Sequence, residues 1–206
     1  MSKKYLIVIG GVLLFLIAFF FIGRQNSSIK NYPPKNSTIV AFGDSLIEGI
    51  GATKGKDFIS LLSLKLKKPI LNSGVLGNTT RDGLARIKDI TDLNPGTVIL
   101  LLGGNDYLKR IPEEETFKNL KEIITQLQSK GIMVVLLGIR GGFLSDRFEK
   151  SFEKLADETK VVYIPNVLDS LFGNQKYMSD VVHPNDLGYA KISEKVYSEI
   201  KNYITP

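Results

Sequence analysis

Three residues of this sequence, Ser45, Asp180 and His183, are the best suited to nucleophilic chemistry. Ser45 follows an apolar run, residues 38–42, whose composition is typical of a buried strand. A serine hydroxyl reacts poorly unless a base takes its proton, and that base needs an orienting group. His183 is the only histidine in 206 residues, so a serine-histidine enzyme built from this chain must use it. Asp180, three positions earlier, is suited to accept the proton on the far ring nitrogen.

These residues also have ordinary structural interpretations. Gly-Asp-Ser, residues 43–45, is common in turns, and a lone histidine is usually a hydrogen-bonded surface or core residue. Pro184 disfavours helical backbone at His183, which favours an extended loop that aims the ring. The G-x-S-x-G elbow of α/β-hydrolases is absent, so that arrangement does not apply. The catalytic interpretation therefore depends on what else the sequence places beside Ser45.

Four separated blocks resemble, in the same order, the signature blocks of the SGNH hydrolase family, also called GDSL esterases and lipases. They are Gly-Asp-Ser-Leu at residues 43–46, Asn-Ser-Gly-Val-Leu-Gly-Asn-Thr at 72–79, Gly-Gly-Asn-Asp at 103–106, and Asp-Val-Val-His-Pro-Asn at 180–185. The resemblance spans about residues 37–204, and it is greatest to the bacterial arylesterase, lysophospholipase and acyl-thioesterase branch. No signature position departs from the family pattern.

The resemblance implies a role for each matching residue. It makes Ser45 the nucleophile with Asp180 and His183 as its partners, and it builds the oxyanion hole from Ser45, Gly77 and Asn105. An asparagine amide donates to developing negative charge without titrating, while a glycine leaves its N–H open to substrate. Without the other blocks, Asn105 would be interpreted as a helix cap or turn residue and Gly77 as a loop glycine.

Two further segments are predicted to lie near this site. Arg140, Gly141 and Gly142 follow the fourth predicted strand, so they are expected to line or close the acyl pocket; the alternative is a plain connection to the next helix. The glycine-rich residues 49–56 fail the phosphate-loop pattern, because Asp57 stands where that motif needs Ser or Thr. We interpret them as a flexible loop beside the site.

Apolar, β-branched runs alternate with helical periodicity along the chain. The runs lie at residues 38–43, 69–72, 97–102, 132–138 and 161–164. One helix is expected around Leu84, Ile87 and Ile90, and the last helix can be capped by Asn185 or Asp186. This alternation predicts a three-layer α/β/α fold with a doubly wound, flavodoxin-like parallel sheet of about five strands. Its carboxyl edge would collect the four blocks.

Composition excludes several other classes of protein. The formal net charge is +6, but from Arg24 onward 25 basic residues face 21 acidic ones, scattered over the predicted helices. A nucleic-acid surface is therefore not expected. The absence of cysteine excludes disulfides, a thiolate nucleophile and a lipoprotein-type attachment. With one histidine and no dense carboxylate cluster, neither a metal nor a cofactor is expected.

The amino terminus is predicted to be a membrane anchor. Residues 5–23 carry no charge, and a helix of about 19 residues matches the ~30 Å hydrocarbon thickness. The sequence thus divides into an anchor or signal segment (1–23), a linker (24–37) and a hydrolase domain (38–206). Lysines flank both sides of the span, so charge does not settle its orientation; exported esterases commonly start this way, and we expect a periplasmic or extracellular domain. The alternative is secretion after cleavage of a signal.

The sequence as a whole predicts a serine esterase that hydrolyses acyl esters or thioesters. Aryl esters, lysophospholipids and acyl-CoA are the substrate types that the resemblance implies, with the membrane as partner through the amino-terminal helix. An O-acetyl esterase acting on polysaccharide or peptidoglycan is the enzymatic alternative. A non-catalytic, membrane-anchored binding module on the same sheet is the alternative of a different class.

Overall fold

Five short apolar segments form one parallel sheet in a computed structural model, which describes residues 29–140 and 146–204. In chain order the elements are β1 (Ile39–Gly43), α2 (Ser45–Glu48), α3 (Phe58–Leu66), β2 (Ile70–Gly74), α4 (Thr80–Ala85), α5 (Ile87–Asp92), β3 (Thr97–Leu101), α6 (Gly104–Leu108), α7 (Glu113–Ser129), β4 (Met133–Leu137), α8 (Asp146–Thr159), β5 (Val162–Ile164) and α9 (Asp186–Ile204).

The strands lie in the order β2-β1-β3-β4-β5, and every neighbouring pair is parallel. This order, with the chain reversing direction across the sheet between β1 and β3, confirms the predicted flavodoxin-like arrangement. The three central strands are buried along their whole length, as expected of strands covered on both faces. The carboxyl ends of all five strands consequently meet at one edge, which we call the catalytic edge.

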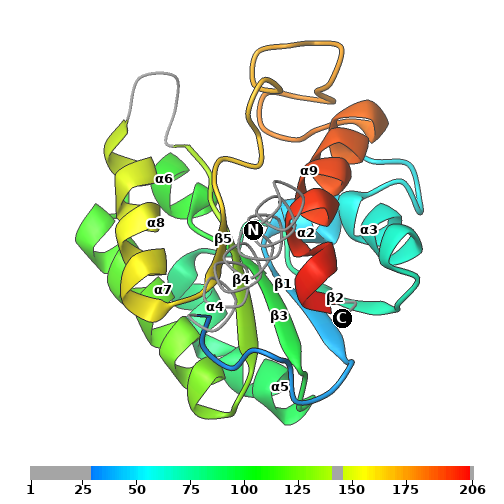
Figure 1. Ribbon diagram of the computed structural model, residues 1–206. Helices are drawn as coiled ribbons and strands as arrows, with labels where there is room; N and C mark the ends of the chain where they lie inside the picture. Colours follow the sequence, from blue (N-terminus) through cyan, green and yellow to red (C-terminus); the bar gives the residue numbers. More distant parts are fainter. Residues whose placement is uncertain (1–28, 141–145, 205–206) are drawn as a thin grey trace, which may run out of the picture.

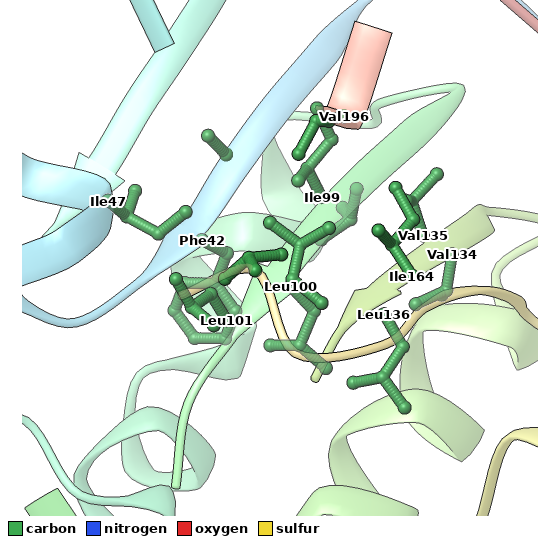
Figure 2. Close-up of a cluster of buried hydrophobic side chains, with 14 of the residues drawn as sticks. Phe42, Ile47, Ile99, Leu100, Leu101, Val134, Val135, Leu136, Ile164 and Val196 are labelled. Carbon is green, nitrogen blue, oxygen red and sulfur yellow. The ribbon is translucent and has the colours of Figure 1, made fainter. Parts of the chain in front are cut away.

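Helices cover both faces of the sheet. On one face α3 packs against α9, and on the other α7 packs against α4 and α8 (Figure 1). Between these layers lies an apolar core that includes Phe42, Leu100, Leu136 and Ile164, each fully buried (Figure 2). Burying one such side chain contributes about 1.5–3 kcal/mol relative to exposure, so the central strands carry much of the stabilisation.

Helix α2, which begins at Ser45, lies very close to the edge strand β2. A Cβ atom added at Gly74 would come within 2.1 Å of the backbone nitrogen of Glu48, so no larger residue fits. β2 also ends in the polar residues Asn72 and Ser73 rather than in an apolar run. Asn72 donates from its side chain to the carbonyl of Ile47 at 2.6 Å, which ties the two elements together.

The helix expected around Leu84, Ile87 and Ile90 is divided in two. α4 ends at Ala85 and α5 begins at Ile87, because Arg86 leaves helical geometry with φ −109° and ψ 13°. The side chain of Arg86 turns instead toward the ends of β1 and β2. The single-helix prediction was therefore wrong at this residue, and the break has a function in the site.

The first described residues pack on the opposite, amino-end side of the sheet. Asn31 donates from its side chain to the carbonyls of Gln128 at 2.9 Å and Ile132 at 3.0 Å, just before β4. The Lys30 N–H donates to the carbonyl of Lys160, just before β5. The second half of the predicted linker is thus bound to the domain. The predicted anchor, residues 1–23, lies outside the described residues; within those described, no helix is long and apolar enough to cross a bilayer.

Candidate active site

Ser45, His183 and Asp180 form a continuous hydrogen-bonded chain at the catalytic edge. His183 Nε2 lies 3.0 Å from Ser45 Oγ, and His183 Nδ1 lies 2.7 Å from Asp180 Oδ2. These three residues come from the end of β1 and from the connection between β5 and α9, 138 positions apart in the case of Ser45 and His183. The geometry is that of a nucleophile, a base and a group that orients the base.

The loop that carries Asp180 and His183 is fixed by its own hydrogen bonds. Asp180 Oδ1 accepts from the N–H groups of Val182 and His183, and the His183 carbonyl accepts from the Ser179 N–H and hydroxyl. The hydrogen bond from His183, together with that from Val182, lowers the pKa of Asp180 to about 2. The carboxylate therefore stays ionised, and able to hold a charged imidazole, throughout the neutral range.

The glycine-rich residues 49–56 pack against this loop. Gly51 has φ +94°, and a Cβ atom there would lie 2.3 Å from Ser179 Oγ and 3.2 Å from His183 Cβ. The Thr53 N–H donates to Asp186 Oδ1 at 2.7 Å. The segment predicted as a flexible loop therefore packs closely against the loop that carries His183. Gly51 must be glycine because it makes the closest approach to that loop.

The residues expected to bind an oxyanion, Ser45, Gly77 and Asn105, lie at the same edge. Ser45 is the first residue of α2, where an N–H has no carbonyl within the helix to bond. Gly77 has φ +77°, and the space beside its Cα is open for at least 4 Å. Asn105, near the start of α6, donates one amide hydrogen to the carbonyl of Asn78 at 3.0 Å. That bond fixes the plane of the amide and leaves its second hydrogen for a ligand.

Asn105 is held in place by its buried neighbour Asp106. The Asp106 carboxylate accepts from the Thr80 N–H at 2.8 Å and from the Thr80 hydroxyl at 2.5 Å. Thr80 is the first residue of α4, whose positive N-terminal end suits a carboxylate. The helix of Asn105 is thereby tied to the helix that follows Gly77.

Arg86, which the sequence analysis missed, ties the nucleophile strand to the oxyanion loop. Its guanidinium donates to the Gly43 carbonyl at 2.7 Å, to the Ser73 carbonyl and hydroxyl at 3.1 Å, and to Asn78 Oδ1 at 2.7 Å. It also lies over the ring of Phe42, 4.3 Å from the centroid. The only sequence signal was a cation inside an otherwise helical apolar pattern, which has no specific meaning.

Two further side chains hold the loop that contains Gly77. Glu48 Oε2 accepts from the Leu76 N–H at 2.6 Å, and Lys109 Nζ donates to the Gly77 carbonyl at 3.0 Å. Neither contact was predicted, because exposed charged residues carry no periodic signal. The backbone around Gly77 is therefore oriented from three separate elements.

The predicted pocket segment is only partly described. Gly141 and Gly142 lie outside the described residues, whereas Arg140 is exposed and its Nε lies 3.2 Å from Glu149 Oε2. Arg140 borders a cleft of about 780 Å³ together with Leu168, Phe172, Met178 and Asp180. Among the described residues, no group of three or more His, Cys, Asp or Glu side chains could hold a metal ion.

Comparison with known proteins places the chain in a family. The GDSL-like Lipase/Acylhydrolase family matches residues 41–191. The arylesterase of Vibrio mimicus is 28% identical over 204 residues, covering 93% of this chain and 98% of that protein. Thioesterase 1/protease 1/lysophospholipase L1 of Escherichia coli (strain K12) is 28% identical over 157 residues, 72% of this chain and 76% of that one. The crystal structure of TesA has a TM-score of 0.75 at 26% identity and covers 81% of this chain and 99% of that one.

The fold and these matches define the chain as a serine hydrolase that acts on ester bonds. It belongs to the GDSL-like lipase/acylhydrolase family, as the four sequence blocks predicted.

Replacing Arg86 with methionine is expected to lower both stability and turnover. The variant keeps the packing on Phe42 but removes the charged donor from the carbonyls of Gly43 and Ser73, so that Gly43 keeps only the Val75 N–H. Hydrogen bonds to a charged group contribute about 1.5–3 kcal/mol each, so the free energy of unfolding should fall by roughly 2–4 kcal/mol. Denaturant unfolding and kcat on a soluble aryl ester measure the two effects. Arg81→Met, at an exposed arginine paired with Glu115, is the matched control and should change neither.

Replacing Asp44 with asparagine is expected to change how stability depends on pH. Asp44 is 2% exposed, and burial raises its pKa from 3.8 to about 7, against the lowering effect of the Leu46 N–H. Between these values the folded state holds a proton that the unfolded state has lost, so stability falls as pH rises from about 4 to 7. The amide introduced by Asp44→Asn cannot ionise yet can still accept from Leu46, so the variant should lose that decline and be the more stable above pH 7. Denaturant unfolding at several pH values tests this, with Asp92→Asn as an exposed control; identical slopes in all three proteins would contradict it.

Proposed function

We propose that the chain hydrolyses carboxylic esters and thioesters through an acyl-enzyme intermediate on Ser45. The observation that carries this proposal is the chain of hydrogen bonds from Ser45 through His183 to Asp180, beside Gly77, whose Cα borders open space, and the fixed amide of Asn105. A nucleophile, a base, its orienting carboxylate and oxyanion donors together are the parts that acyl transfer needs.

In the proposed first half-reaction, His183 Nε2 takes the proton of Ser45 as Oγ attacks the acyl carbonyl carbon. The oxyanion that forms is bound by the N–H groups of Ser45 and Gly77 and by the Asn105 amide. His183 then gives the proton to the departing oxygen or sulfur, which leaves the acyl group on Ser45. Asp180 stabilises the imidazolium while it exists.

In the second half-reaction, water takes the place of the leaving group. His183 removes a proton from the water as its oxygen attacks the acyl carbon, and the same donors bind the second oxyanion. Collapse of this intermediate returns the proton to Ser45 Oγ and releases the carboxylic acid. The free hydroxyl and neutral imidazole are restored, so no cofactor enters the balance.

The proposed substrates are aryl esters, lysophospholipids and acyl-CoA thioesters. The relatives named arylesterase and thioesterase/lysophospholipase support this range. Large apolar side chains also stand exposed on the segments that follow the strands at the catalytic edge: Val75, Leu76 and Val181 on loops, and Tyr107 and Leu108 on α6. An aliphatic or aromatic acyl group gains more from such surroundings than an acetyl group does. We therefore place O-acetylated polysaccharide or peptidoglycan second.

We also propose that residues 5–23 anchor the protein in a membrane, with the catalytic domain outside the cell or in the periplasm. The length and charge-free composition of the segment support an anchor rather than a cleaved signal. In the alternative, the segment is removed and the domain is secreted.

Ser45→Ala is expected to abolish hydrolysis of aryl esters of every acyl length without changing the fold, because it removes one oxygen at the catalytic edge. The wild-type protein should also be labelled by a serine-reactive phosphonate, and the variant should not. Ser198→Ala, which alters an exposed hydroxyl on α9, is the control for both measurements. Failure of the phosphonate to label the wild-type protein would favour the non-catalytic binding module.

Asn105→Ala should lower kcat by roughly 10²–10³-fold, since the amide acts on charge that develops only in the transition state. Asn105→Asp should be at least as damaging, because it sets an anion against an oxyanion. A residue that served only as a turn or helix cap would show the reverse order, because Asp caps as well as Asn does. Measuring kcat and melting temperature for both variants separates these roles, and wild-type turnover in Asn105→Asp would refute the assignment.

A further inference from the structure

The connections that lead into the strands carry an unusual charge. They are residues 29–38, 67–69, 93–96, 130–132 and 160–161, and together they contain six lysines and no Asp or Glu. The connections that leave the strands, residues 44–57, 75–79, 102–112, 138–145 and 165–185, contain six basic and six acidic residues. The positive charge of the domain is therefore concentrated on the side opposite the catalytic edge.

These lysines belong to a single surface, which we call the amino-end face. Its members Lys30, Lys35, Lys67, Lys130 and Lys160 are all exposed. Lys35 Nζ donates to the carbonyl of Lys130 at 2.8 Å, and the Lys30 N–H donates to the carbonyl of Lys160, so the segment before β1 crosses the starts of β4 and β5. Lys67 precedes the outermost strand on the other side, β2. With strands spaced by about 4.8 Å, the cations extend roughly 19 Å across the sheet.

Two of the three acidic residues closest in sequence to this face are already paired, and the third is the exposed Asp157 in the last turn of α8. Asp92, in the last turn of α5, pairs with Lys88 at 2.5 Å, and Glu158, in the last turn of α8, pairs with Lys121 at 2.7 Å. The six lysines of the face therefore keep an excess of positive charge over Asp157. A row of lysines with so few acidic neighbours fits a flat anionic surface better than a compact ligand.

The sequence that precedes the described residues indicates that this anionic surface is a lipid bilayer. The charge-free residues 5–23 precede the face, and only residues 24–28 separate them from Ile29, where contact with the face begins. Five residues span at most about 18 Å. A domain of this size is about 40 Å across, so such a tether cannot bring the catalytic edge round to the same bilayer.

We propose that the amino-end face docks on a bilayer that contains anionic phospholipid and holds the catalytic edge pointing away from it. This inference rests on the proposed anchor, and it deepens the proposed function. Substrate reaches Ser45 from the aqueous side, as a dissolved ester or one carried on another surface, and not from the bilayer to which the protein is attached. Residues 24–28 restrict the orientation of the domain on the bilayer, and docking by the lysines fixes it.

Because the chain has no cysteine, single-cysteine probes can test this orientation in the full-length protein. A fluorophore is attached at Ser37→Cys on the amino-end face or at Val181→Cys, a position 85% exposed on the catalytic edge. Each protein is reconstituted into phosphatidylcholine vesicles with and without phosphatidylglycerol, with a headgroup nitroxide lipid as quencher. We expect quenching at Ser37→Cys only when phosphatidylglycerol is present, and no quenching at Val181→Cys in either vesicle.

The charge dependence is tested by replacing Lys30, Lys67, Lys130 and Lys160 together with glutamine. In this background, quenching at Ser37→Cys should fall to the level seen in phosphatidylcholine alone. The matched control replaces Lys54, Lys118, Lys150 and Lys191, which removes the same charge elsewhere and should keep the quenching.

Two outcomes would overturn the proposal. One is quenching at Val181→Cys, and the other is quenching at Ser37→Cys that depends neither on phosphatidylglycerol nor on the four lysines. Circular dichroism and denaturant unfolding of each unlabelled variant report folding, and hydrolysis of a soluble aryl ester by the wild-type protein is measured separately. Absence of that activity from the wild-type protein would refute the proposed function, while leaving the orientation result to stand on the probes.

Discussion

The geometry of the catalytic edge depends on how the ends of β1 and β2 are held together. At the carboxyl edge of a parallel sheet the last carbonyls need donors from outside the strands. Here Arg86 donates to the carbonyls of Gly43 and Ser73, and the Gly43 carbonyl also accepts from the Val75 N–H at 3.1 Å. The same guanidinium bonds Asn78, whose carbonyl in turn accepts from Asn105. The partly buried guanidinium of Arg86 therefore connects β1, the strand before Ser45, to the segments that carry Gly77 and Asn105, the two proposed oxyanion residues outside α2. The break between α4 and α5 at Arg86 lets its side chain make these hydrogen bonds.

The molecule is polarised along its strands. The side on which the strands start is lined by lysines, whereas the side on which they end combines balanced charge with exposed apolar residues such as Leu76, Leu108 and Val181. A parallel sheet makes this separation simple, because every incoming connection lies on one side and every outgoing connection on the other. Substrate chemistry and attachment can then be encoded in different loops with little interference.

The strands of the sheet could be predicted from the sequence because burial of a strand requires apolar residues. Strands β1, β3 and β4 are buried on both faces, so they must be apolar throughout, and such runs are visible without a structure. The four signature blocks likewise contain Ser45, Gly77, Asn105 and His183, and Ser45 and His183 lie within hydrogen-bond distance of each other. The roles of these residues stay predictions. Arg86, Glu48 and Lys109 were missed because each acts through a side chain that reaches another element. Contacts of that kind depend on tertiary geometry and leave no periodicity in the sequence.

Two carboxyl groups influence His183, and their surroundings give them opposite properties. Asp44 is buried, and its pKa rises to about 7, so near neutrality a large share of its population is uncharged. Asp180 is half exposed and bonded to His183 and to two backbone N–H groups, and its pKa falls to about 2. In the proposed mechanism the partner of the imidazolium must stay ionised near neutrality, and of these two carboxyl groups Asp180 fits that role. Asp44 instead caps α2 through the Leu46 N–H, which fixes the start of the helix that begins at Ser45.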